Sequence, residues 1–195
     1  MTRGKPLSFD RSEVLGRAMD YFWTHGYEAT GMTELLNHLG IQRQSFYNSF
    51  ESKGHVFQEA IEFYSSGMLD RLQGALRSGK TPIESIKNVF KFWESLGESG
   101  DCRGCLLGNA VAEFGATDEK ITKMVQKNLR AVENAFHKVF KQAIDEGFLP
   151  KDRDPRVQAR TMLTCGQGLA LMSKTGMSIR ALKEVMKNME RSLLM

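Results

Sequence analysis

Two cysteines, Cys102 and Cys105, lie on either side of Arg103 and Gly104. A thiol beside an arginine and at the start of a helix ionises readily to the reactive thiolate, so this pair is a candidate redox or electrophile switch. Lys174, a charged residue at the end of an apolar segment, is a candidate partner for a thiolate. A dithiol redox enzyme is one interpretation of the pair. Burial of Cys105 as a small core residue is another.

Other chemistry finds little support in the sequence. One CxxC pair supplies too few ligands for a tetrahedral zinc site, and the 4 histidines are scattered without ligand spacing, so we expect no metal and no cofactor. No Ser/His/Asp set, carboxylate pair or phosphate-binding loop is present, and we do not expect an enzyme. The odd count of 3 cysteines argues against a disulfide framework.

The composition is that of a soluble globular protein, with 41% hydrophobic and 26% charged residues. The apolar runs are too short to cross a membrane. The first residues carry no apolar stretch of a secretory signal, which favours the cytoplasm. The net charge of +4 permits a nucleic-acid partner without requiring one, because basic and acidic side chains are equal in number over residues 1–53.

The clearest functional pattern lies between residues 33 and 50, where the apolar spacing predicts two short helices joined by a turn at Gly40. Phe46 and Phe50 are expected to face the core. The polar side chains left on the outer face are Gln42, Arg43, Gln44, Ser45, Tyr47 and Asn48, and residues 35–50 include no acid. Arginine suits a guanine edge, Gln or Asn an adenine edge, and tyrosine a phosphate. Lys53, at the start of the next helix, is a candidate for a further phosphate contact.

On spacing alone, the same pattern also fits a helical protein-interaction module that never contacts DNA. Capping residues and apolar periodicity predict an all-α chain of about nine helices, with no β-strand. We expect a helix-turn-helix domain over residues 1–53 and a larger helical bundle over residues 54–195.

The second half offers candidates for an effector pocket and for a dimer interface. Aromatic residues at helical spacing, Trp93 and Phe114 among them with Phe90, Phe92, Phe136 and Phe140, either line a pocket or form plain core. The last two helices carry more apolar surface than one bundle needs, which predicts a four-helix interface with a second copy. Its expected members are Leu163, Gly166, Leu169, Leu182, Val185, Met186 and Met189.

A set of residues in register resembles the N-terminal signature of the tetracycline-repressor (TetR) family of bacterial transcriptional regulators. These residues are Gly26, Tyr27, Thr30, Leu35, Gly40, Ile41, Ser45, Phe46, Tyr47, Phe50, Ser52 and Lys53. The resemblance covers about residues 9–57 and implies a homodimer that binds a palindromic operator, usually as a repressor. It also implies a C-terminal ligand-binding and dimerisation domain that releases the DNA when an effector binds. The segment from Gly104 to Asn109, GCLLGN, resembles one in a subset of the family, some of which respond to reactive species.

Carried over by position, the resemblance makes residues 42–49 the recognition helix. Tyr47 and Lys53 become phosphate contacts, and Arg43 and Ser45 the foremost base readers. The sequence departs from the family where Gly31 and Gln42 replace helix-capping hydroxyls and Gln44 replaces a small residue. Thr30 or Thr33 is then expected to supply the missing phosphate-contacting hydroxyl. The operator, the effector and the regulated genes stay open.

Overall fold

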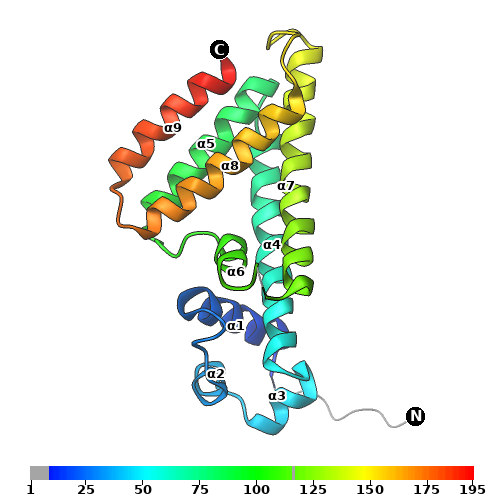
Figure 1. Cartoon of the computed structure of the whole chain (residues 1–195), viewed down its shortest axis with the longest axis vertical. Helices are drawn as coiled ribbons and strands as arrows, with labels where there is room; N and C mark the ends of the chain where they lie inside the picture. Colours follow the sequence, from blue (N-terminus) through cyan, green and yellow to red (C-terminus); the bar gives the residue numbers. More distant parts are fainter. Residues whose placement is uncertain (1–8, 116) are drawn as a thin grey trace, which may run out of the picture.

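The computed structural model describes residues 9–115 and 117–195, and over these ranges the chain forms nine α-helices and no strand (Figure 1). The predicted all-α class is confirmed. The first eight residues of the predicted N-terminal domain lie outside the described ranges. The helices are α1 (Arg11–His25), α2 (Met32–Leu39), α3 (Arg43–Phe50), α4 (Lys53–Arg77), α5 (Pro82–Glu98), α6 (Leu106–Phe114), α7 (Glu119–Asp145), α8 (Pro155–Lys174) and α9 (Ile179–Leu194).

Local sequence sets the ends of the first helices. The Asp10 carboxylate accepts the backbone N–H groups of Ser12 and Glu13, which stabilises the start of α1. Gly40 ends α2 in the left-handed conformation at φ 64°, where a Cβ atom would be strained. The chain therefore turns sharply between α2 and α3, as the helix-turn-helix interpretation requires.

The long helix α4 begins where the Ser52 hydroxyl accepts the N–H of His55. It runs from the small N-terminal unit of α1, α2 and α3 into the bundle of the remaining helices (Figure 1). Within that bundle α8 packs along α7, and α9 packs against α5 and α8. The predicted boundary between residues 53 and 54 falls in the first turn of α4.

The buried side chains form two clusters that do not follow this boundary. The first joins α1, α2, α3 and the start of α4 to Leu106 and Phe114 of α6 and to Ile121 and Val125 of α7. The second joins the far end of α4 to α5, α8, α9 and the rest of α7. Because α6 belongs to the first cluster, the N-terminal unit shares a continuous core with part of the bundle.

Candidate nucleic-acid interface and effector cavity

The outer face of α3 is built from the residue types that read DNA. Phe46 and Phe50 are fully buried and fix the helix on the core. Arg43, Gln44, Tyr47 and Asn48 are exposed on the opposite side, with Ser45 half-buried and Gln42 exposed just before the helix. The Gln44 amide donates to the Asn48 side-chain oxygen at 3.2 Å, so these two side chains lie together.

This face carries one guanidinium, several amides and hydroxyls, and no carboxylate. Such a set can donate to phosphate oxygens and can pair with base edges in a major groove, which is wide enough to admit an α-helix. Gln42 makes no side-chain capping bond to α3, so its amide stays available for an outside partner.

The structure separates the two threonines proposed as hydroxyl donors. Thr30 is only 2% exposed, and its hydroxyl donates to the carbonyl of Gly26. The prediction of a phosphate contact from Thr30 is therefore wrong, because its hydroxyl is buried and already bonded. Thr33 is exposed in the first turn of α2, so of the two threonines only its hydroxyl is accessible to an outside partner.

Lys53 is more constrained than the sequence suggested. Its ammonium donates to the carbonyls of Tyr27 at 3.0 Å and Thr30 at 2.9 Å, and it lies 4.0 Å from the centre of the Tyr27 ring. An ammonium has three N–H bonds, so one is left for a phosphate. The first effect of Lys53 is to fasten the start of α4 to the turn between α1 and α2.

The two cysteines of the CxxC pair lie in different environments. Cys102 is exposed, whereas Cys105 is half-buried in the position just before α6. The Gln167 amide of α8 lies 3.6 Å from the Cys105 sulfur. Burial, with Cys105 close by, raises the pKa of the Tyr64 hydroxyl above its usual range.

The Lys174 side chain lies beside the loop that carries the cysteines, but its amine is not bonded to the Cys105 sulfur. Its amine donates to the Asn109 side chain at 2.9 Å. Lys174 and Cys105 both line an open cleft that separates α6 and α8 from the end of α1. The fold therefore brings the lysine to the cysteine loop, as the thiolate-partner hypothesis needs.

A partly open cavity of about 130 Å³ lies between α4, α5, α7 and α8, with Cys105 in its wall. Of the predicted aromatic residues, Trp93, Phe92 and Phe136 line it. Phe114 does not, because it packs at the base of α6 against Tyr27 and Phe57, with ring centres 5.2 and 5.6 Å away. The pocket prediction for Phe114 is therefore wrong. Phe90 and Phe140 are buried in the second cluster and are absent from the cavity wall.

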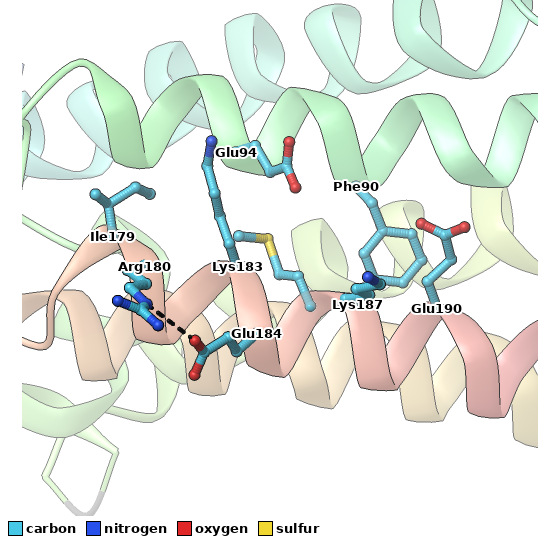
Figure 2. A pocket seen from close by; sticks show the side chains of 9 residues that line it. Phe90, Glu94, Ile179, Arg180, Lys183, Glu184, Lys187 and Glu190 are labelled. Carbon is cyan, nitrogen blue, oxygen red and sulfur yellow. Dashed lines mark hydrogen bonds and ion pairs between the residues drawn. The ribbon is translucent and has the colours of Figure 1, made fainter.

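A second hollow runs along the surface between α5 and α9 (Figure 2). Phe90 lies at its floor, and Glu94, Lys183 and Glu190 stand around it. Three cationic and three anionic side chains line this groove, so it offers no single-sign field for a charged ligand; they are Arg180, Lys183, Lys187, Glu94, Glu184 and Glu190.

Several residues predicted at a dimer interface pack inside their own chain instead. Leu182 and Met186 are 6% and 3% exposed and belong to the second cluster. A Cβ atom on Gly166 would lie 2.8 Å from the Trp93 ring of the same chain, so this glycine serves packing of α8 on α5. The prediction is wrong for these three, because the helical face that seemed surplus is covered by α5 and α7. Leu163, Leu169 and Met189 are half-buried against the same cluster.

Of the residues predicted at the dimer interface, Val185 is exposed on α9. The sequence reasoning missed the other residues of the face that α8 and α9 leave open. Along α8 the exposed residues at heptad-like spacing are Val157, Thr161, Thr164, Gly168 and Leu171. Along α9 they are Val185, Asn188 and Ser192, with Met195 directly after the helix. None of these side chains is charged. Leu171 is 63% exposed and Val157 51%, so the stripe presents large aliphatic side chains on the outer face of α8. The heptad spacing was a signal available in the sequence.

No group of three His, Cys, Asp or Glu side chains that could hold a metal occurs in residues 9–115 and 117–195. Over the same ranges no helix is long and apolar enough to cross a membrane.

Comparison with known proteins gives two family matches. The family described as "Bacterial regulatory proteins, tetR family" matches residues 14–60, and "Tetracyclin repressor-like, C-terminal domain" matches residues 82–189. The chain is 28% identical over 173 residues to the transcriptional regulator YezE of Bacillus subtilis, covering 88% of this chain and 89% of that protein. It is 24% identical over 186 residues to the transcriptional repressor ComR of Escherichia coli, covering 94% and 89%.

Solved structures show the same arrangement. A cysteine mutant of the TetR family regulator CifR, in complex with 26-bp operator DNA, superposes with a TM-score of 0.87 at 25% identity. The match covers 97% of this chain and 99% of that one.

Proposed function

Because this chain belongs to the TetR family of bacterial transcriptional regulators, we propose that it binds a palindromic operator as a homodimer and represses transcription until an effector releases it. The observation that carries the proposal is the outer face of α3, where Arg43, Gln44, Tyr47 and Asn48 are exposed together and no acid accompanies them. In this proposal Arg43 and Ser45 read bases, Gln44 and Asn48 read an adenine edge, and Tyr47 holds a phosphate. Further contacts to the phosphates of the DNA backbone come from Gln42, Thr33 and the remaining N–H of Lys53.

The test is selection of duplexes from a random-sequence library by the purified protein, followed by competition binding. We expect recovery of a palindrome with half-sites about one helical turn apart. Tyr47→Phe, which removes only the hydroxyl, should weaken binding to every duplex by a similar factor, whereas Arg77→Ala, at the far end of α4, should change nothing. Recovery of no common sequence would contradict the proposal.

Dimerisation through α8 and α9 is supported by the uncharged stripes that both helices expose. Thr161, Thr164 and Gly168 are small, so two copies of α8 can approach closely between the larger Val157 and Leu171. A charge placed on a large side chain of this stripe would be buried unpaired in the dimer. Leu171→Glu should therefore give a monomer by sedimentation. Val111→Glu, exposed on α6, is the matched control.

For the effector, the cavity beside Cys105 is the candidate site, and Trp93 is part of its wall. A compound that fills this cavity or adds to the Cys105 thiol would push apart α4, α5 and α8. Treatment with N-ethylmaleimide should release the wild-type protein from its selected duplex. Cys105→Ser should abolish that response and Cys102→Ser should not. A response unchanged in both variants would remove the cysteine hypothesis and leave a non-covalent effector.

The remaining features of the proposal follow the family. We propose a DNA-binding domain over residues 1–53 and a ligand-binding and dimerisation domain over residues 54–195, a cytoplasmic location, no cofactor and no catalytic activity. Catalytic activity is tested by incubating the purified protein with a disulfide substrate and a dithiol reductant. We expect no turnover.

A further inference from the structure

The loop that carries the two cysteines also holds the N-terminal unit. Between them, Arg103 donates to the Asp20 carboxylate of α1 at 3.0 Å, and its guanidinium lies 4.0 Å from the centre of the Trp23 ring. Asp101 binds the same guanidinium at 2.8 Å, which holds the pKa of the Asp101 carboxyl below its usual range. The guanidinium is therefore fixed by its own loop and aimed at α1.

A second contact comes from the other end of α6. The Glu113 carboxylate accepts the backbone N–H groups of Tyr27 at 3.1 Å and Glu28 at 2.6 Å, in the turn that follows α1. Gly26 lies directly beneath this carboxylate, since a Cβ there would be 3.5 Å from it. Backbone donors cannot change rotamer, so this contact fixes the path of the chain between α1 and α2.

Between these two polar contacts the joint is apolar. Tyr27 and Phe57 pack on Phe114 of α6, and the Tyr27 and Phe57 ring centres are 4.9 Å apart. This apolar contact is part of the core that the two units share, and it holds them together. Hydrogen bonds are directional, so those of Arg103 and Glu113 further restrict the angle between the units.

The Arg103 loop is itself set by α8. Gly104 has φ 74°, and a Cβ there would lie 2.9 Å from the carbonyl of Ala170 in α8. The Asn109 side chain donates to the Arg103 carbonyl at 3.0 Å and accepts from Lys174 of α8 at 2.9 Å. A displacement of α8 would thus be passed directly to Arg103.

We propose that Arg103 and Glu113 are positioning residues that fix the angle between α1 and the bundle, and thereby the separation of the two α3 helices in the dimer. The inference rests on the proposed function, since it concerns how that dimer matches a palindrome. The contacts are present in an arrangement that superposes on the operator complex of CifR. Neither residue touches DNA. They act through the position of α3.

The experiment compares two probes, the palindromic duplex recovered from the random library and the same duplex with one half-site scrambled. In Arg103→Ala and Glu113→Ala, Kd for the palindrome should rise at least tenfold and Kd for the single half-site should change less than twofold. In Glu113→Gln one of the two acceptor oxygens becomes an NH2 group that faces a backbone N–H. Its palindrome affinity should therefore fall as well, to a value between those of the wild type and Glu113→Ala. Arg77→Ala is the control. Equal weakening on both duplexes, or no change on either, would overturn the proposal.

A second measurement needs no DNA and separates failure of the inference from failure of the proposed function. The three native cysteines are replaced by serine, and spin labels are attached at Asn48→Cys in α3 and Lys138→Cys in α7. Labelled protein is diluted into unlabelled protein, so the distance between the two labels reports the angle within one chain. The distance distribution should be narrow with both contacts intact and at least twofold broader in Arg103→Ala. An equally narrow distribution in that variant would contradict the inference, whatever the DNA result.

Discussion

Replacing Lys53 by methionine separates a structural role for this lysine from a role in DNA binding. Methionine keeps the length and apolar stem of the side chain but removes the ammonium that bonds the Tyr27 and Thr30 carbonyls. Thr30 is only 2% exposed, so water does not readily replace the lost donor at its carbonyl. The Tyr27 carbonyl keeps a second partner, the N–H of Thr30 at 3.1 Å.

These contacts set the magnitude. A hydrogen bond from a charged donor contributes about 1.5–3 kcal/mol, and the second, to a carbonyl that stays paired, contributes less. The cation–π contact with the Tyr27 ring adds about 0.5–1 kcal/mol at a partly exposed position. Because the contacts share one ammonium, their losses are not additive. We expect Lys53→Met to lower the free energy of unfolding by about 3 kcal/mol and the melting temperature by about 6–12 °C.

The assay combines thermal unfolding with the salt dependence of DNA affinity. A lysine whose main role is a phosphate contact would reduce the slope of log K against log salt by about 1 and leave the melting temperature unchanged. We expect the melting temperature to fall, which a pure phosphate contact would not produce. The slope should also fall by up to about 1, because the third N–H of the ammonium is left for a phosphate. Lys123→Met is the control, because Lys123 makes only an exposed ion pair with Glu119 and should cost about 0.5 kcal/mol or less. An unchanged melting temperature with a reduced slope would refute the reasoning.

Three further predictions concern single side chains. Thr30→Val should lower the free energy of unfolding by about 1 kcal/mol, because it removes the hydrogen bond of a buried hydroxyl. Operator affinity should stay unchanged at a temperature where the variant is folded. A loss of affinity at that temperature would restore Thr30 as a DNA contact. Gly166→Ala places a methyl group 2.8 Å from the Trp93 ring. Thermal unfolding should show a free energy of unfolding lower by about 1 kcal/mol, because the clash outweighs the gain in helix propensity. A stabilised variant would show that α8 is not packed as described. Burial raises the pKa of the Cys165 thiol, which lowers its thiolate fraction near neutral pH, so peptide mapping after iodoacetamide treatment should find Cys102 modified well before Cys165, and the reverse order would contradict the burial.

The helices were predictable because their signals are local. Asp10, Thr81 and Asp118 are side chains that typically cap helices, and each accepts a backbone N–H at the start of α1, α5 or α7. Gly40 ends α2 as expected. The outer face of α3 was predictable for the same reason, since two buried phenylalanines fix which side of a short helix faces outward.

The packing partner of each buried helix face was not predictable. Apolar periodicity shows which face of a helix is buried, but not which part of the chain covers it. Phe114 and Gly166 both carry packing signals, but the neighbours are Tyr27 and Trp93 from distant parts of the chain. Thr30 shows the same limit for a polar group, because only the folded turn brings its hydroxyl to the Gly26 carbonyl.

The most direct test of DNA reading by α3 is the Kd of wild type and Arg43→Ala for the selected palindrome and for a scrambled duplex, at one physiological salt concentration. Wild type should prefer the palindrome by at least about 10³-fold. Arg43→Ala should lose about 1–3 kcal/mol on the palindrome and almost nothing on the scrambled duplex, because a base contact is lost and phosphate contacts remain. Equal losses on both duplexes, or no preference in the wild type, would contradict sequence reading by this helix.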